Sequence, residues 1–447
     1  MGVGSPTTRV LIAGSGGREH ALAWACMRGH PDVEIVCAPG NGGTAAFATN
    51  VAVAADDPAG VVAAARDCDA TLVVVGPDAA LAAGVADACR AAGIAVFGPS
   101  TAAARIESSK SFAKGLMDTA GIPTARWSTG TAPDRGALMA LVNELDGRCV
   151  VKADGLALGK GVTVCSDLDA ARQAVGACLD GRLFGRAGDR VIVEERLQGP
   201  ELSVLAVTDS RHLRLLPPAR DYKRIGDGDS GPNTGGMGAM TPPPGADDAL
   251  LKRVEAEVLR PCIDALAALG TPFSGCLYAG IMLTPDGMRV LEFNARFGDP
   301  ETQVVLPILD EDFLELLIAS AAGAVSPGIA RRAVQSCAVG VVLAAAGYPG
   351  TPRRGDVITG LDRLDPSILA FHAATRRDPS SRDPGLTREG AGGARALRTD
   401  GGRVLTLVAR GDSLEAATEQ AYTGLQGIYF EGMQYRNDIG MAQAGER

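Results

Sequence analysis

Three polar side chains, Glu292, Asn294 and Arg296, alternate with apolar ones in the segment Val290–Gln303, VLEFNARFGDPETQ. On a strand, side chains alternate between faces, so these three are expected together, with Leu291 and the other apolar residues opposite. A carboxylate and an amide oxygen at this spacing can share a hard cation such as Mg²⁺, which also takes phosphate oxygens as ligands. The guanidinium beside them can hold a phosphoryl or carboxylate group. The alternative is the solvent face of an edge strand, which the adjoining turn RFGDPE disfavours.

A glycine-rich loop follows a second apolar strand in VVKADGLALGKGVT. Lys152 ends the strand, and the loop holds Gly155, Gly159 and Gly161 together with Lys160. Such a loop lets backbone N–H groups approach phosphates while the lysines supply charge. It is not a Walker A loop, because no G-K-[ST] precedes a helix. Taken alone, an ordinary hairpin turn fits equally well.

Two acidic residues, Glu194 and Glu195, end the strand expected in VIVEERLQGPELS. The backbone groups there are placed to hydrogen-bond the edge of an adenine, and the Glu201 carboxylate is placed to accept from ribose hydroxyls. Exposed acids at a strand end are the alternative interpretation.

The long segment Asp221–Gly238, DYKRIGDGDSGPNTGGMG, is unusually rich in glycine and polar residues. Lys223 and Arg224 are candidates to hold a phosphate, and Asn233 with the glycines suggests a closing flap. Because so long a connection is rarely passive, it is expected to be either functional or disordered.

The turn GSGGREH, residues 14–20, joins an expected strand to an expected helix. Its N–H groups and the helix dipole favour a bound anion. A nicotinamide dinucleotide is disfavoured, because Glu19 replaces the third glycine of G-x-G-x-x-G and would oppose a pyrophosphate. A single phosphate or a phosphosugar fits better.

The elements that position these groups suggest three domains. Strands alternating with helices as far as Phe97 predict a parallel doubly wound sheet, and Ser100 is expected to cap the next helix. One helix is expected over Ala79–Ala92, and others over Lys110–Ala120 and Leu250–Ala268. We expect boundaries of 1–105 for an α/β substrate-binding domain, 106–328 for a central domain with a mobile lid at about 123–195, and 329–447 for a small α+β domain. Within the last, residues 376–395 are expected to form a mobile loop.

Bulk composition narrows the class of protein. A net charge of −9 and a pI near 5.1 argue against nucleic acid as a main partner, because neutralising phosphates needs a basic face. The ten cysteines are scattered without a C-x-x-C pair, which suggests reduced, structural thiols in an intracellular protein. With neither a signal peptide nor an apolar run long enough to span a membrane, a cytoplasmic protein is expected.

Taken together, RFGDPETQ, KADGLALGKGV, GPNTGGMGA and GSGGREHA resemble the phosphoribosylamine–glycine ligase family of the ATP-grasp superfamily. The resemblance runs from about Arg9 to Ile439. It implies an N-terminal pre-ATP-grasp sheet, a central ATP-grasp fold and an ADP-forming joining of glycine to 5-phosphoribosylamine in purine biosynthesis. The hinge reads EERL where an aromatic third residue is expected, Asp78 stands where Glu is usual, and Pro200 replaces an acid; these departures bear on detailed contacts.

The motifs and the resemblance together assign site residues. ATP is the expected nucleotide, with Mg²⁺, or alternatively Mn²⁺, held by Glu292 and Asn294, and the expected catalytic residues are Arg296, Lys152 and Lys223. The nucleotide is expected at Lys110, Lys152, Gly155, Gly159, Lys160, Gly161, Glu194, Glu195, Leu197 and Glu201. The other substrates are expected at Gly14, Gly16, Gly17, Arg18, Glu19, Asn41, Asp78, Asp221, Asn233, Gly235, Gly236 and Asp299.

In the implied mechanism the glycine carboxylate attacks the γ-phosphorus of ATP, and the amine displaces phosphate from glycyl phosphate without a protein general base. Asp299 and Asp221 are both candidates for holding the glycine ammonium. The protein is expected to be a monomer or a weak homo-oligomer that binds neither nucleic acid nor membrane. Other interpretations are another ATP-grasp ligase or a carboxylase of the same pathway, a non-catalytic nucleotide sensor and a nicotinamide oxidoreductase.

Overall fold

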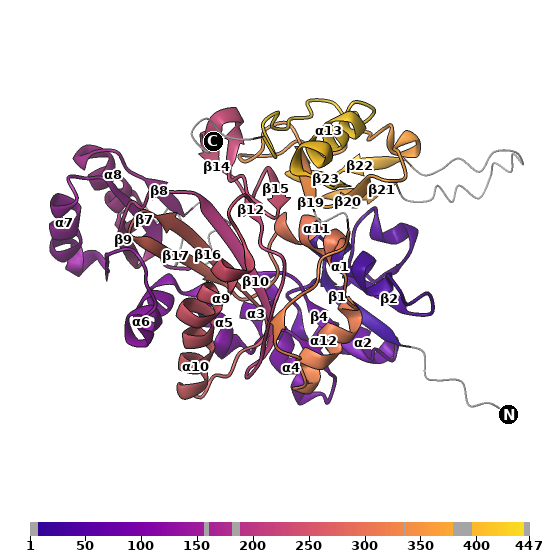
Figure 1. Ribbon diagram of the computed structural model, residues 1–447, viewed down its shortest axis with the longest axis horizontal. Coiled ribbons are helices and arrows are strands. Elements are labelled where there is room, and N and C mark those ends of the chain that lie inside the picture. The colour runs from indigo at the N-terminus through magenta and orange to yellow at the C-terminus, as the bar shows by residue number, and fades with distance from the viewer. Residues whose placement is uncertain (1–7, 156–160, 181–187, 335–336, 379–395, 442–447) are drawn as a thin grey trace, which may run out of the picture.

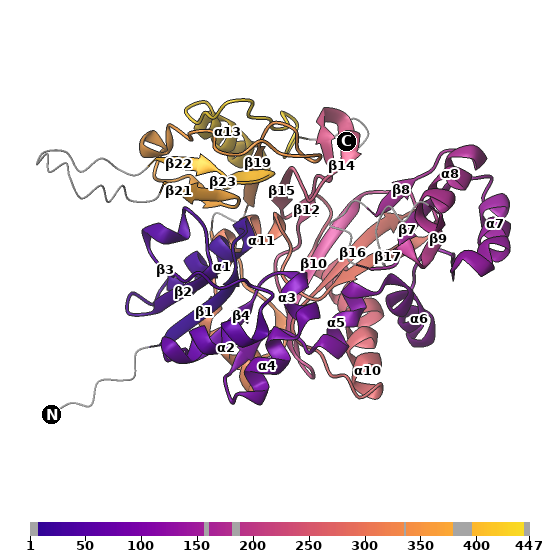
Figure 2. The same ribbon diagram turned by 180° about the vertical axis from the view of Figure 1, so that it is seen from behind.

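The computed structural model describes residues 8–155, 161–180, 188–334, 337–378 and 396–441 (Figure 1). Within these residues no helix combines the length and the apolar content needed to cross a bilayer. Seen from either side, a small helix-covered sheet projects at one end of the molecule, the N-terminal domain lies at the other, and the C-terminal strands and α13 (Leu414–Leu425) lie beside the N-terminal domain (Figures 1 and 2).

The N-terminal domain is a parallel five-stranded sheet with helices on both faces, as predicted. Alternate residues of its central strand face opposite sides: Leu11 packs in the core with α2 to α4, and Ile12 packs in the core with α1 and α12. The strand order is β3 (Thr49–Asn50), β2 (Glu34–Pro39), β1 (Arg9–Gly14), β4 (Leu72–Val75) and β5 (Val96–Phe97). The helices are α1 (Gly17–Met27), α2 (Pro58–Asp67), α3 (Asp78–Ala83), α4 (Val85–Ala91) and, from later in the chain, α12 (Phe313–Ala322).

The single helix expected over Ala79–Ala92 is wrong, because Gly84 divides it into α3 and α4. Gly84 has a φ of +91°, a left-handed conformation that ends a helix and that glycine adopts without steric cost. Ser100 caps the following helix, α5 (Thr101–Ser108), by accepting from the Ala103 N–H, as predicted.

The central domain contains two sheets. The larger has the order β17 (Gly287–Asn294), β16 (Ser274–Thr284), β10 (Glu201–Asp209), β11 (Leu213–Leu215) and β18 (Gly328–Ile329). Helices α5, α6 (Lys110–Ala120) and α10 (Arg260–Ala268) share a hydrophobic core with it. A helix α9 (Asp248–Val254) and a π turn, Glu255–Leu259, lead into α10, which confirms the helical segment expected at Leu250–Ala268.

The smaller central sheet forms the projecting end of the molecule (Figure 1). Its antiparallel strands run in the order β6 (Trp127–Gly130), β9 (Val191–Glu195), β7 (Cys149–Ala153) and β8 (Val162–Val164). Helices α7 (Arg135–Glu144) and α8 (Leu168–Leu179) share a separate hydrophobic core with β7 and β9. A core of its own is consistent with a subdomain that moves as a unit.

The segment Asp221–Gly238 is ordered, so disorder, one of its two expected alternatives, is wrong. It contains β12 (Arg220–Asp221), β13 (Arg224–Gly226) and β14 (Ser230–Asn233), and it leads into β15 (Gly238–Thr241). The C-terminal β19 (Cys337–Ala344) pairs with β15, and β23 (Arg403–Gly411) and β20 (Leu369–His372) extend the same sheet. A short hairpin, β21 (Thr375–Arg377) and β22 (Leu397–Thr399), flanks it; most of the mobile loop expected at 376–395 lies outside the described residues.

Two histidines join the N- and C-terminal domains. The His20 Nδ1 on α1 accepts from the His372 N–H of β20 at 3.0 Å, and their rings stack with centroids 5.4 Å apart. Burial, together with the neighbouring His372, lowers the pKa of His20 to about 3. Burial, together with Arg377, lowers the pKa of His372 to about 4. Both imidazoles are therefore neutral at physiological pH.

Candidate active site

A cavity of about 890 Å³ lies where the domains meet. The cavity is lined by the smaller central sheet (β6, β9, β7 and β8), called the lid sheet from here on, and by β16, β17 and the 221–238 segment. The N-terminal domain adds Arg18 and Asp78, and the C-terminal domain adds Tyr348 and Arg403. This volume is at the upper end of the range for small-molecule sites. Most of the predicted site residues are brought to this one place.

Glu292, Asn294 and Arg296 all line the cavity, as expected from their alternation. The expectation that the apolar residues lie opposite is wrong for Leu291 and Phe293, because both line the cavity as well. Gly280 pairs with Glu292 and Ile281 with Val290, so Leu291 is the extra residue of a β-bulge. The bulge turns the Leu291 carbonyl toward the Lys152 ammonium, which donates to it at 3.4 Å.

The Glu292 carboxylate is suited to binding a cation. Burial alone would raise the pKa of Glu292, but surrounding ammonium groups, led by Lys223 and Lys152, hold it below its ordinary value. Among the described residues no group of three or more acidic, histidine or cysteine side chains is placed to hold a metal. The Glu292 carboxylate and the Asn294 amide oxygen, which also accepts from Arg296 Nη2 at 3.3 Å, are donors of the kind that Mg²⁺ takes, since this ion keeps several waters and adds substrate phosphates as ligands.

Arg296 is held by a partner that the sequence did not reveal. Its Nη2 lies 2.8 Å from Glu107 Oε1, and its Nη1 donates to the Phe297 carbonyl at 3.1 Å. Burial raises the pKa of Glu107, although the guanidinium opposes this shift. Among the residues that the structure describes, none accepts from the buried Arg296 Nε, so this N–H is left as a donor for a ligand.

A buried ion triad joins the lid sheet to helix α6. The Glu194 carboxylate pairs with the Lys114 ammonium at 2.7 Å and with the Lys152 ammonium; the three side chains are between 3% and 9% exposed. Burial alone would raise the pKa of Glu194, but Lys152 and Lys114 hold it below its ordinary value. Burial lowers the pKa of Lys114 despite Glu194. Exposed acids at the end of this strand, the alternative interpretation, are therefore wrong for Glu194.

Lys114 was missed, although a signal was present. It follows Lys110 by one helical turn, so both lysines lie on one face of α6 and both line the cavity. The Lys110 ammonium donates to the Gly155 carbonyl at 2.8 Å, at the beginning of the glycine-rich loop. Asp154 ties the same loop to α6 by accepting from the Ser111 N–H at 3.1 Å. Of the predicted loop residues, Gly155 and Gly161 line the cavity, and Gly159 and Lys160 lie outside the described residues.

The end of β9 and the segment that follows it form another wall of the cavity. Glu195, Leu197 and Glu201 line it, and Arg196 lies between them with its side chain available in place of the absent aromatic residue. The Lys223 ammonium pairs with Glu201 at 2.6 Å, which links this wall to the 221–238 segment.

The 221–238 segment lines the cavity with Asp221, Asn233 and Gly235. Its outer end is fastened by Arg436, whose side chain is fully buried and pairs with Asp229 at 2.7 Å and Asp438 at 2.6 Å. The segment is thus fastened to the C-terminal part of the chain at Asp229, a residue that also lines the cavity.

The 14–17 glycine turn, with Glu19 and Asn41, does not line the cavity. The Gly16 N–H donates to Glu19 Oε2 at 2.6 Å, so a protein carboxylate already satisfies this end of the helix. Asn41 Nδ2 donates to the Ser15 carbonyl at 2.9 Å and the His372 carbonyl at 2.8 Å. Of the group expected at this turn, only Arg18 reaches the cavity; for the others, contact with a substrate stays a prediction.

A clamp of two sheets, with lysines, the start of a glycine-rich loop and a strand carrying Glu292 and Asn294 at its centre, defines an ATP-grasp enzyme. Models of the N, ATP-grasp (A) and C domains of phosphoribosylglycinamide synthetase match residues 8–107, 108–302 and 338–442. The chain belongs to the phosphoribosylglycinamide synthetase family.

Relatives agree with this assignment over nearly the whole chain. The phosphoribosylamine–glycine ligase of Streptomyces coelicolor is 48% identical over 98% of this chain and 100% of its own length, and that of Nostoc is 45% identical over 97% and 99%. The crystal structure of the Thermotoga maritima ligase superposes with a TM-score of 0.80 at 33% identity, covering 96% of this chain and all of that one. A Campylobacter jejuni biotin carboxylase shares the fold alone, at 16% identity and a TM-score of 0.67.

Proposed function

We propose that this protein is an ADP-forming ligase that joins glycine to 5-phosphoribosylamine and gives glycinamide ribonucleotide for purine biosynthesis. The observation that carries the proposal is the gathering of Glu292, Asn294 and Arg296 in one cavity with four lysines. The names of the full-length relatives support the choice of substrates. A monomeric or weakly associating protein of the cytoplasm stays our prediction.

Different residues of the cavity have different roles in phosphoryl transfer. Lys110 and Lys152 contact the ATP phosphates, and the wall formed by residues 195–201 receives the adenosine. Mg²⁺ held by Glu292 and Asn294 would neutralise charge on the phosphates. Arg296, with its free Nε–H, holds the transferring phosphoryl group or the glycine carboxylate. Such transfer depends on positioning and on charge neutralisation more than on covalent help from the protein.

The joining proceeds in two steps. A carboxylate oxygen of glycine attacks the γ-phosphorus, ADP leaves, and glycyl phosphate forms. The phosphoribosylamine nitrogen then attacks the acyl carbon, the C–O bond to phosphate breaks, and the nitrogen loses a proton.

Asp221 is our choice for the group that holds the glycine ammonium. Its Oδ1 is buried and has no hydrogen-bond partner in the part of the chain that the structure describes. Burial, reinforced by neighbouring carboxylates such as Glu301, raises the pKa of Asp221 well above its ordinary value, although Lys223 opposes this. An ammonium group bound here would favour the carboxylate form. Asp299, the other candidate, is already paired by Arg403 and Gln303.

The test is a coupled assay of ADP formation that omits each substrate in turn. ADP is expected only with ATP, glycine and phosphoribosylamine together; breakdown with bicarbonate or formate in place of glycine would instead favour another ATP-grasp ligase or a carboxylase. Glycine labelled with ¹⁸O in its carboxylate tests the intermediate, because one labelled oxygen must leave with the released phosphate. Unlabelled phosphate would exclude glycyl phosphate.

Asp221→Asn tests the ammonium site separately. Loss of the charge is expected to raise the KM for glycine at least about tenfold while leaving the KM for ATP within about twofold. An unchanged KM for glycine would move the ammonium elsewhere.

A further inference from the structure

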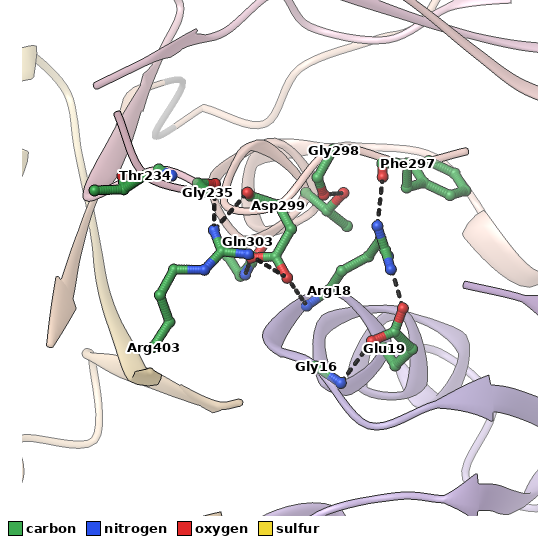
Figure 3. Close-up of polar contacts among 12 residues, drawn as sticks. Gly16, Arg18, Glu19, Thr234, Gly235, Phe297, Gly298, Asp299, Gln303 and Arg403 are labelled. Atoms are coloured by element: carbon green, nitrogen blue, oxygen red, sulfur yellow. Dashed lines mark hydrogen bonds and ion pairs between the residues drawn. The ribbon is translucent and has the colours of Figure 1, made fainter. Parts of the chain in front are cut away.

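Arg403 brings the C-terminal domain into direct contact with the centre of the cavity. It is the first residue of β23, and its side chain is 22% exposed. Its Nη1 donates to the Gly235 carbonyl at 2.5 Å and to the Asp299 carbonyl at 2.7 Å (Figure 3). Its Nη2 lies 3.4 Å from Asp299 Oδ2. One guanidinium therefore bridges two segments that are more than sixty residues apart in the sequence. They are the 221–238 segment, called the flap from here on, and the turn 297–299 after β17.

The flap side of this bridge is closely fitted. The Gly235 N–H donates to the Tyr348 hydroxyl at 2.8 Å, so the C-terminal domain holds this residue from both its N–H and its carbonyl. A Cβ on Gly235 would lie 3.1 Å from the Arg403 Cζ, so the guanidinium lies directly against the glycine. Any other side chain here would press on the guanidinium.

The Asp299 side of the bridge continues into the N-terminal domain. Asp299 Oδ2 also faces the Arg18 N–H in the first turn of α1, at 3.5 Å, and Oδ1 accepts from Gln303 Nε2 at 2.7 Å. The Arg18 guanidinium donates to the Phe297 carbonyl at 3.2 Å (Figure 3). Burial alone would raise the pKa of Asp299, but Arg403 and Arg18 hold it below its ordinary value. The turn 297–299 is thus held by hydrogen bonds from Arg18 of the N-terminal domain and Arg403 of the C-terminal domain.

This turn directly follows Arg296, and the flap carries Asn233 and Gly235. We propose that Arg403 is a positioning residue: by holding the flap and the turn 297–299 together, it shapes the side of the cavity away from the nucleotide, where the amine substrate lies next to glycine. The inference rests on the proposed function for the identity of that substrate. The nucleotide side of the cavity, formed by the lid and α6, has no contact with Arg403 among the described residues.

Arg403→Met tests the inference, because it keeps the length of the side chain and removes its donors. The KM for phosphoribosylamine is expected to rise at least about tenfold, with the KM for ATP changed by less than about threefold. Arg403→Lys should recover part of the loss, since one ammonium can reach one carbonyl but not both. Arg410→Met, the same change near the other end of β23 and away from the cavity, is the matched control and should behave as wild type.

Hydrogen exchange in the absence of substrates gives a second readout. In Arg403→Met the Gly235 and Gly236 amides should exchange at least about tenfold faster than in wild type, while the lid sheet is unchanged. A variant that melts like wild type and keeps both Michaelis constants and the flap exchange rates would overturn the proposal. An equal rise in both Michaelis constants would overturn it too, because it indicates a general loss of structure.

The two proposals fail in distinguishable ways. If wild type forms no ADP from glycine and phosphoribosylamine, the proposed function is wrong, and the exchange experiment still decides the role of Arg403. If wild type is active and Arg403→Met is indistinguishable from it in both readouts, only the positioning role is wrong.

Discussion

Replacing Glu194 by glutamine should expose the electrostatic cost of the buried triad. In the native protein one carboxylate neutralises the Lys114 and Lys152 ammonium groups, and all three side chains are at most 9% exposed. Glu194→Gln keeps the shape and leaves two buried cations without an anion. Removing one partner of a buried ion pair costs roughly 3–5 kcal/mol. Each kcal/mol lost lowers the melting temperature of a domain of this size by about 2–4 °C, so the melting temperature of the transition that includes the lid should fall by at least about 6 °C.

Both a higher pH and a bound nucleotide should reduce this loss of stability. Burial already lowers the pKa of Lys114, and without Glu194 it falls further. The folded variant then binds fewer protons than the unfolded chain, so its stability rises with pH, and the deficit at pH 9 should be smaller than at pH 7. ADP or ATP should stabilise the variant more than wild type, because its phosphates supply the missing negative charge.

Thermal melting at pH 7 and pH 9, with and without ADP, measures these effects. Glu195→Gln is the matched control: the neighbouring carboxylate is 41% exposed and lies 3.8 Å from Arg126, so its loss should cost less than about 1 kcal/mol. A Glu194→Gln protein that melts within a degree or two of this control, or whose deficit does not shrink at high pH, would refute the reasoning.

Two further predictions concern the cation site and the domain contact. Glu292→Gln should lower kcat at least about 100-fold and raise the Mg²⁺ concentration needed for half-maximal rate; a wild-type Mg²⁺ titration in this variant would place the metal elsewhere. Because the pKa values of His20 and His372 are lowered to about 3 and about 4 by burial, the unfolded chain takes up protons that the native state does not, so stability should fall as the pH drops from about 6.5 toward 4. Urea denaturation across this range measures the fall; His20→Gln should make it shallower, and an unchanged slope would show that other groups cause it.

Local signals in the sequence predicted most of the elements. Helix α6 begins at Lys110 and ends at Ala120 as expected, because Ser109 caps its first turn and Gly121 takes the left-handed conformation after its last. The alternation of Glu292, Asn294 and Arg296 likewise needed only the pleat of a strand. The bulge at Leu291 has no such signal, since the register of β16 against β17 decides it.

The partners of the site residues were harder to predict, because they come from distant parts of the chain. Glu107 and Arg296 are 189 positions apart by their numbers, and Arg403 lies 104 positions from Asp299. Neither Glu107 nor Arg403 belongs to a motif, so only the packing of domains identifies them. Glu19, in contrast, was predicted to oppose a pyrophosphate. Its carboxylate accepts the hydrogen bond from the Gly16 N–H, which a phosphate oxygen would otherwise accept.

The sheet β12-β15-β19-β23-β20 has a practical consequence for dissecting the protein. Strands β12 and β15 precede the boundary expected at residue 329, and β19, β23 and β20 follow it. A cut there would leave an unpaired strand edge on both products, four residues long on β15 and eight on β19, and each product alone would be prone to aggregate. When the two pieces are expressed together, β15 and β19 should pair and restore the sheet. The activity recovered by such a split enzyme would then measure how far the two pieces associate.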